Sequence, residues 1–222
     1  WTQRPERSQV PIVRFMVWLS LRTGRSVSRV LLHGIALYFL LFSPRARGHL
    51  QTYYQRLWGQ PAGWRQLYRH FFSFASMIHD RVFLLNGQHD QFDITLHGRE
   101  ALDAAMRGDQ GVVIMGAHFG SFEVLKSLGD AHGQTVHMLM YAENASKLNA
   151  ILAAINPQAA AHIIALNRVD SMLVAREKLA HGDWLGLLAD RTFANDATTA
   201  RCFLGAPAPF PTGPLRLAAL LG

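Results

Sequence analysis

Residues 111–123, GVVIMGAHFGSFE, give the clearest indication of the fold class. Its first seven residues form a continuous apolar run, which is typical of a strand buried on both faces of a parallel sheet. The next residues, HFGS, interrupt that run, and a helical pattern begins at Phe122. A strand that leads through a short loop into a helix is the repeating unit of α/β proteins.

The same alternation continues in both directions from about residue 91. Short apolar runs predict strands at 93–96, 111–117, 135–141, 162–166 and 184–189. Helices of two to three turns are predicted between them at 100–106, 122–131, 145–155 and 170–180. Residues 91–222 therefore read as an α/β domain whose mostly parallel sheet is flanked by helices. We expect this domain to continue beyond Gly222, since the chain stops inside an apolar helical pattern.

The first 90 residues have a different texture and predict a helical, basic segment. Of the 22 basic groups, eleven are arginines within residues 1–70, where Glu6 is the single acid. The arginines alternate with apolar runs at 10–21 and 30–42, a pattern that argues against nucleic-acid binding. Residues 43–92 read as further helices, with turns at 59–63 and 87–90.

The apolar run at 30–42 is too short to span a bilayer, which takes roughly 20 residues. The expected structure is one or two helices that dip into one leaflet, with the arginines near anionic headgroups. Trp18, Tyr38, Trp58 and Trp64 are the predicted interfacial anchors. A buried helical hairpin in a soluble core is the alternative. One cysteine in 222 residues excludes a disulfide scaffold, and half the residues being apolar excludes disorder.

Chemistry in a parallel sheet is expected beyond the carboxyl ends of the strands. His118 follows the first strong strand, and Glu123 follows five residues later on the entering helix. That spacing suits a histidine held by a carboxylate and free to act as general base, and it does not suit a helical metal pair. Gly120 would let backbone amides approach a bound group. The alternative is a structural histidine beside an ordinary acid at a helix start.

A second cluster follows the predicted strand at 184–189. Asp190 and Arg191 stand at its end, and a proline-rich stretch, 203–214, is expected to form a rigid loop that opens a helix. Arg216 lies in the first turn of that helix, and helix starts and arginine forks both attract anions. A surface ion pair and a proline-shaped turn are the alternative interpretation.

These motifs together carry a family resemblance over nearly the whole chain. The chain resembles the lysophospholipid acyltransferase superfamily, in its branch of bacterial lipid A biosynthesis (late) acyltransferases. The matching pieces are GAHFGSFE at 116–123, GDWLGLLADR at 182–191, FLGAPAPFPTGPLRLA at 203–218, and the upstream ERS, LYFLLFSPRAR and HFFSFASMIHDRVFLLNG. Thr212 stands where glycerolipid members carry Glu, which argues for the lipid A-like branch.

The resemblance implies an acyltransferase on the cytoplasmic face of the inner membrane that acts without a cofactor or metal. His118 would be the base, Glu123 its orienting acid, and Asp190 and Arg191 further catalytic groups. Acyl carrier protein or coenzyme A would deliver the acyl thioester, and a lipid or glycolipid would accept it. The expected substrate-binding residues are Gly120, Arg168, Arg201, Thr212, Gly213 and Arg216, with the arginines forming a basic rim for the donor.

Three other classes of function stay open at this point. A Rossmann-type oxidoreductase or methyltransferase would share the alternation, but the loop reads GAHFG and not GxGxxG. A metal-dependent hydrolase could use some of the 11 histidines, although none form a pair with ligand spacing. A non-catalytic lipid-binding protein that docks on membranes would explain the basic segment and leave His118, Glu123 and Asp190 unexplained.

Overall fold

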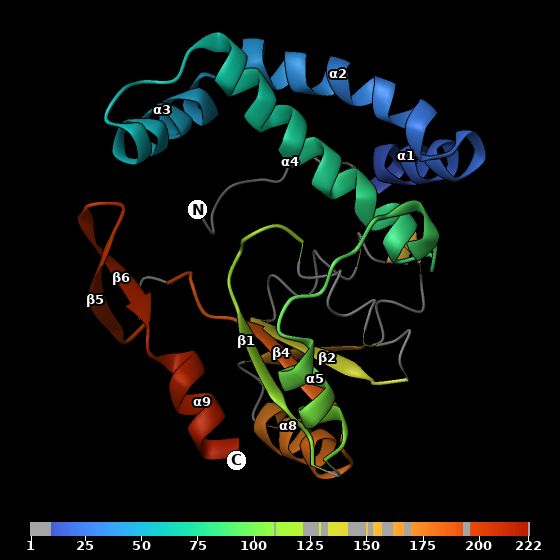
Figure 1. Cartoon of the computed structure of the whole chain (residues 1–222), viewed down its shortest axis with the longest axis vertical. Helices are drawn as coiled ribbons and strands as arrows, with labels where there is room; N and C mark the ends of the chain where they lie inside the picture. Colours follow the sequence, from blue (N-terminus) through green and yellow to red (C-terminus); the bar gives the residue numbers. More distant parts are fainter. Residues whose placement is uncertain are drawn as a thin grey trace.

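The computed structural model describes residues 10–108, 110–121, 129, 133–141, 150, 153–156, 162–166, 170–192 and 196–221. Within these residues a layer of helices lies over one end of a parallel sheet (Figure 1). The expected α/β class is confirmed, and so is the helical character of the N-terminal segment. The predicted domain boundary near residue 90 stays a prediction.

Four helices form the N-terminal layer, and glycines separate two of the pairs. Gly24 and Gly59 adopt positive φ, of 81° and 73°, which residues with a side chain rarely adopt, so each ends a helix. Pro44 opens the third helix at a position where its missing N–H costs nothing. The helices are α1 (Val10–Thr23), α2 (Arg25–Phe42), α3 (Pro44–Trp58) and α4 (Trp64–Leu84).

The long helices α2 and α4 pack against each other through one stripe of α2. Ser28, Leu32, Ala36 and Leu40 are buried at intervals of four residues, the spacing that keeps side chains on one helix face. Leu40 joins a small core with Tyr54, Ala62 and Leu67, which attaches α3 and the turn before α4. The opposite face of α2 stays exposed.

In the described part of the chain, the sheet contains four parallel strands in the order β1-β4-β2-β3. These are β1 (Val113–Gly116), β2 (Val136–Tyr141), β3 (Ile163–Leu166) and β4 (Trp184–Leu188), and each was predicted within two residues. The predicted helices at 100–106 and 170–180 are α5 (Arg99–Met106) and α8 (Ser171–Ala180). The helices predicted at 122–131 and 145–155 lie largely outside the described residues. The sheet core includes Leu139, Ile164, Ala175, Leu185 and Leu187.

The strand predicted at 93–96 is wrong. After the short 3₁₀ turn η1 (His89–Gln91), residues 93–96 are exposed and bond to no described strand, so no sheet supports their strand-like pattern.

A second core cluster joins the layers, since Val17 of α1 and Phe83 of α4 pack with Met138 of β2.

The predicted rigid loop at 203–214 is also wrong, because most of it belongs to an antiparallel hairpin. The hairpin pairs β5 (Thr198–Phe203) with β6 (Ala206–Pro211), and α9 (Gly213–Leu221) follows. Thr212 N donates to Ala197 O, which sets the alternation of bonded and non-bonded pairs along the ladder. All three prolines of β6 then fall at pairs that need no hydrogen bond to β5, so the strand tolerates them.

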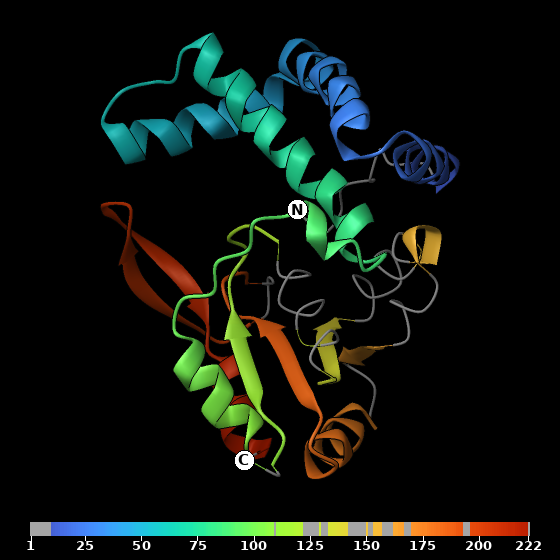
Figure 2. The ribbon, with the colours of Figure 1, turned by 45° about the vertical axis from the view of Figure 1, so that its right-hand side comes forward.

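The strands β1 and β4 point their carboxyl ends toward the helical layer (Figure 2). The hairpin stands beside the same end of the sheet, and α9 runs away from it (Figures 1 and 2). The edge where parallel sheets hold their chemistry therefore faces α4.

Candidate active site

Two loops meet at this edge because β1 and β4 are neighbours in the sheet. Gly116, the last residue of β1, pairs with Leu188, the last of β4. Ala189 N donates to Gly116 O at 2.9 Å, so the register persists into the loops. His118 and Asp190 each lie two residues beyond their strands, which brings together groups 72 positions apart in the chain.

His118 and Asp190 form a direct hydrogen bond. The distance from His118 Nδ1 to Asp190 Oδ1 is 2.8 Å, and the two side chains are 36% and 25% exposed. Burial alone would raise the pKa of Asp190, but the hydrogen bonds from His118 outweigh it and lower that pKa. A carboxylate can only accept, so Nδ1 carries the proton of this bond, and in the neutral imidazole Nε2 then keeps its lone pair. The pair can therefore take a proton from a substrate hydroxyl.

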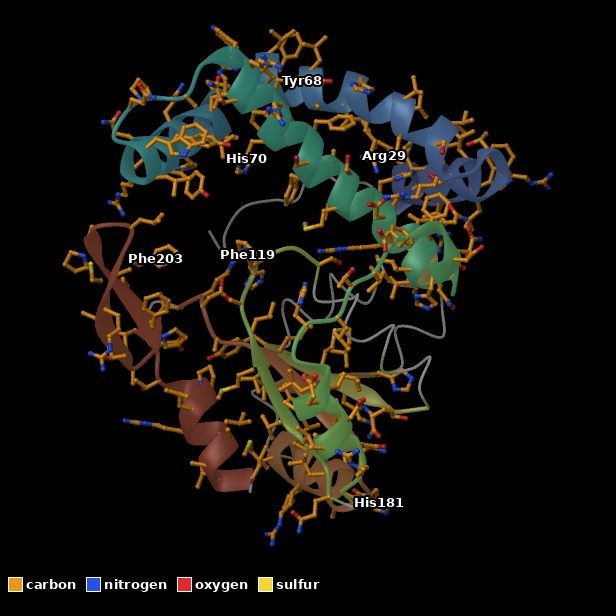
Figure 3. The ribbon with its side chains drawn as sticks, in the orientation of Figure 1. Arg29, Tyr68, His70, Phe119, His181 and Phe203 are labelled. Carbon is orange, nitrogen blue, oxygen red and sulfur yellow. The ribbon has the colours of Figure 1, made fainter. Side chains whose placement is uncertain are left out.

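The loop that follows the histidine is open to a ligand. Phe119 is 97% exposed, and Gly120 has a φ of 79° with nothing within 4 Å of where a Cβ would stand. An exposed aromatic side chain and an accessible backbone thus flank His118, as Figure 3 shows for Phe119 above the end of β1.

The remaining predicted site residues fall into two groups. Glu123 and Arg168 lie outside the described residues. Arg191, Arg201 and Arg216 are exposed, on the loop after β4, on β5 and in the first turn of α9. Thr212 donates its hydroxyl to Ala197 O at 3.0 Å, a bond that closes the base of the hairpin. Gly213 begins α9 and is exposed.

Tyr141 is a polar group at this edge that the sequence reasoning missed. It ends β2, the other neighbour of β4, and its hydroxyl donates to Asp196 Oδ1 at 3.2 Å. Burial, followed by the charge of Asp196, raises the pKa of Tyr141. Its position as the last residue of a predicted strand was the available signal.

A parallel α/β sheet with a histidine–carboxylate pair beyond its carboxyl edge defines a candidate enzyme site for general-base chemistry. The comparison with known families agrees with that class. A family model described as bacterial lipid A biosynthesis acyltransferase matches residues 4–222, almost the whole chain. The chain belongs to this family and is an acyltransferase. The comparison with curated proteins gives no significant match.

Members of this family are membrane-associated in bacteria. Among the described residues, α2 is the one helix long and apolar enough to cross a membrane, with a mean hydropathy of 1.3 over 18 residues. Eighteen helical residues measure about 27 Å, slightly less than a hydrocarbon core of about 30 Å.

The helical layer exposes apolar side chains on a large outer surface, here called the outer helical surface. On α2 it is the face opposite the buried stripe, where Val30 and Phe42 are 65% and 64% exposed. Its members, from α1 and α2, are Ile12, Phe15, Trp18, Val27, Val30, Leu31, Leu37, Tyr38, Leu41 and Phe42. Soluble proteins rarely leave so many large apolar side chains exposed on two neighbouring helices.

Proposed function

We propose that this acyltransferase moves a fatty acyl group from a thioester donor, acyl carrier protein or coenzyme A, to a hydroxyl of a lipid A-like glycolipid. The reaction would occur at the cytoplasmic face of the inner membrane. The observation that carries the proposal is the 2.8 Å bond between His118 and Asp190, which leaves Nε2 available at an open edge of the sheet.

In the proposed mechanism, His118 Nε2 takes the proton of the acceptor hydroxyl as that oxygen attacks the thioester carbonyl. The carbon–oxygen bond of the new ester forms, and the carbon–sulfur bond of the thioester then breaks. The proton passes from the imidazolium to the leaving thiolate. Asp190 stabilises the imidazolium while it exists, and amides near Gly120 or the Arg191 guanidinium stabilise the oxyanion.

Glu123 remains the orienting acid that the sequence suggests, beside the partner that the geometry supports. The two carboxylates can be separated by substitution. If Asp190 orients His118, Asp190→Asn should lower kcat more than Glu123→Gln does. The reverse order would return the orienting role to Glu123.

The outer helical surface is proposed to rest on the bilayer. Trp18 and Phe42 contribute large exposed rings from α1 and α2. The double variant Trp18→Ser/Phe42→Ser should sediment less with vesicles of anionic phospholipid than the parent protein. Leu173→Ser is the matched control, because Leu173 is as exposed but lies on α8. Equal sedimentation of all three proteins would contradict this orientation.

The basic rim for the donor is proposed to include Arg168, Arg191, Arg201 and Arg216. Charge pairs of this kind act mainly on encounter and are screened over about 8 Å at physiological salt. Because Arg201 and Arg216 are exposed, their reversal should leave the fold intact. Arg201→Glu or Arg216→Glu should raise the donor KM and flatten its salt dependence. An unchanged donor KM in both variants would remove this surface from the donor path.

The central experiment supplies the purified full chain with acyl carrier protein and coenzyme A thioesters in parallel, together with a lipid A precursor. Mass spectrometry of the lipid product should show one added acyl ester with at least one donor. Lack of any acylated product with both donors would contradict the proposed reaction. Thioester hydrolysis alone, without a lipid product, would indicate that water is the acceptor.

A further inference from the structure

A cavity of about 360 Å³ lies between the helical layer and the catalytic loop. Ser121 forms part of its wall and is three residues from His118. Three residues span at most about 11 Å, so a ligand in the cavity lies within reach of the general base. The wall is completed by Arg29 from α2, by Phe72, Ser73, Ser76, Met77, Asp80 and Leu84 from α4, and by Phe92.

The cavity wall carries a net positive charge among the described residues, because two arginines lie near one carboxylate. Asp80 is the acid of the wall, and Arg25 binds both its oxygens at 2.9 and 3.0 Å. Burial would raise the pKa of Asp80, but His79, Arg25 and, through its charge alone, Arg29 lower it to about 2. Arg29 donates to Ser76 Oγ at 3.4 Å and lies 5.9 Å from the Phe72 ring. Among the described residues it forms no ion pair, and Figure 3 labels it where α2 faces α4.

The polar and aromatic groups of the cavity wall suit an organic phosphate as the ligand. A guanidinium beside two serine hydroxyls can bind phosphate oxygens, because arginine presents several donors in a planar fork. The volume exceeds what a small ion fills, since one water occupies about 30 Å³ in the liquid. Phe72 and Phe92 offer apolar walls to the rest of such a ligand.

We infer that this cavity binds the phosphate-bearing headgroup of the acyl acceptor, with Arg29 as a phosphate ligand, an inference that rests on the proposed function. The helix α2, which supplies Arg29 to the cavity wall, also carries part of the outer helical surface, including Val30. An acceptor held at a membrane by its acyl chains would therefore have its headgroup close to the helices that wall the cavity. A donor also carries phosphate in its pantetheine arm, and the experiment must separate the two sources.

The kinetic test compares a phosphorylated glycolipid acceptor with its dephosphorylated form. Arg29→Gln should raise the KM for the phosphorylated acceptor about 10- to 100-fold, the loss expected for a charge-assisted hydrogen bond, and leave the donor KM unchanged. Arg29→Lys should recover part of the loss. Arg176→Gln, an exposed arginine on α8, is the control and should behave like the parent. A rise in donor KM alone would assign the phosphate to the donor and overturn the inference.

A binding test does not depend on turnover. Glucosamine 1-phosphate should bind the full chain more tightly than glucosamine, and Arg29→Gln should remove the difference. Ser73→Glu places a negative charge on an exposed part of the wall and should weaken phosphate binding without disturbing packing. If this binding is seen without acyl transfer, the proposed reaction is contradicted and the inferred phosphate site is supported. If both substitutions leave binding unchanged, or the parent does not distinguish the two sugars, the phosphate site is wrong.

Discussion

His118–Asp190 and His137–Asp183 are two histidine–aspartate pairs carried by the same sheet, with bond lengths of 2.8 and 2.9 Å. The first lies beyond the carboxyl ends of β1 and β4, with 36% of the histidine side chain exposed. The second lies near the amino ends of β2 and β4, where His137 is buried and its ring lies against His162. The length of the bond therefore does not distinguish the pair proposed to be catalytic from the pair proposed to be structural. Solvent exposure and the end of the strand at which each pair lies are what differ.

The nitrogen that each pair uses differs as well. His118 bonds through Nδ1, which leaves Nε2 at the open edge, whereas His137 bonds through Nε2 and has its ring enclosed. The first pair can exchange a proton with a substrate. We expect the second to contribute stability and no chemistry.

The largest expected effect is on the rate of acyl transfer, which should differ between variants of the two histidines. His118→Ala should lower acyl transfer by roughly 10²- to 10⁴-fold, as the loss of a general base does, with the fold intact. His137→Ala should keep activity within a few-fold once the folded fraction is corrected for. Initial rates with saturating donor measure both. Near-parental turnover by the His118 variant would remove His118 as the base.

Substitution of the two aspartates should affect activity with the same contrast as substitution of the two histidines. Asp190→Asn leaves an amide that can hold His118 in the wrong tautomer, so kcat should fall by roughly 10²-fold or more. Asp183→Asn should leave kcat almost unchanged. Comparable losses in the two variants would show that distance from the open edge does not matter.

For folding stability we expect the opposite order, with a larger loss from substitution of Asp183 than of Asp190. Asp183→Ala leaves the buried His137 ring without its partner, at a cost of about 1–3 kcal/mol. For a chain of this size that lowers Tm by roughly 2–4 °C per kcal/mol. Asp190→Ala, at a solvated edge, should shift Tm less. Thermal denaturation followed by circular dichroism is the measurement, and a larger shift for Asp190 would contradict the structural role of Asp183.

The smallest expected effect is a loss of folding stability at low pH. The pKa of Asp190 is lowered from 3.8 in the folded state, so its pairing stabilises the fold fully above about pH 4. That contribution is lost as pH falls further, through the folded pKa. Because the pair is partly solvated, its size is at most about 1 kcal/mol. The stability difference between the parent and Asp190→Asn, measured in urea, should shrink below pH 4. A difference that grows in acid would have the wrong sign.

The sequence predicted the strands that build the edge because their apolar runs are continuous and buried. It also assigned both His118 and Asp190 to strand ends. Which carboxylate meets the histidine depends on strand order, and a local pattern contains no information on which strands are neighbours. Glu123 is the partner expected from its closeness in sequence; it lies outside the described residues, so its role stays a prediction. Asp190 meets His118 because β1 lies beside β4.

The other differences between prediction and structure have separate causes. The hairpin was missed because prolines usually argue against a strand, and their alternate spacing, which makes them compatible with one, was not weighed. Tyr141 was missed although it ends a correctly predicted strand. The cavity at Arg29 could not be predicted, since it depends on how α2 and α4 pack and on where the catalytic loop meets them.

The prolines of β6 have a consequence for how copies of this protein behave at high local concentration. Because Pro207, Pro209 and Pro211 are the residues that face away from β5, the outer edge of β6 offers no N–H donor. The carbonyl groups of a strand from another molecule therefore find no N–H donor along that edge. Confinement to a membrane surface crowds proteins into two dimensions, where exposed strand edges promote aggregation. The proline spacing therefore protects the β6 edge of the hairpin against such association.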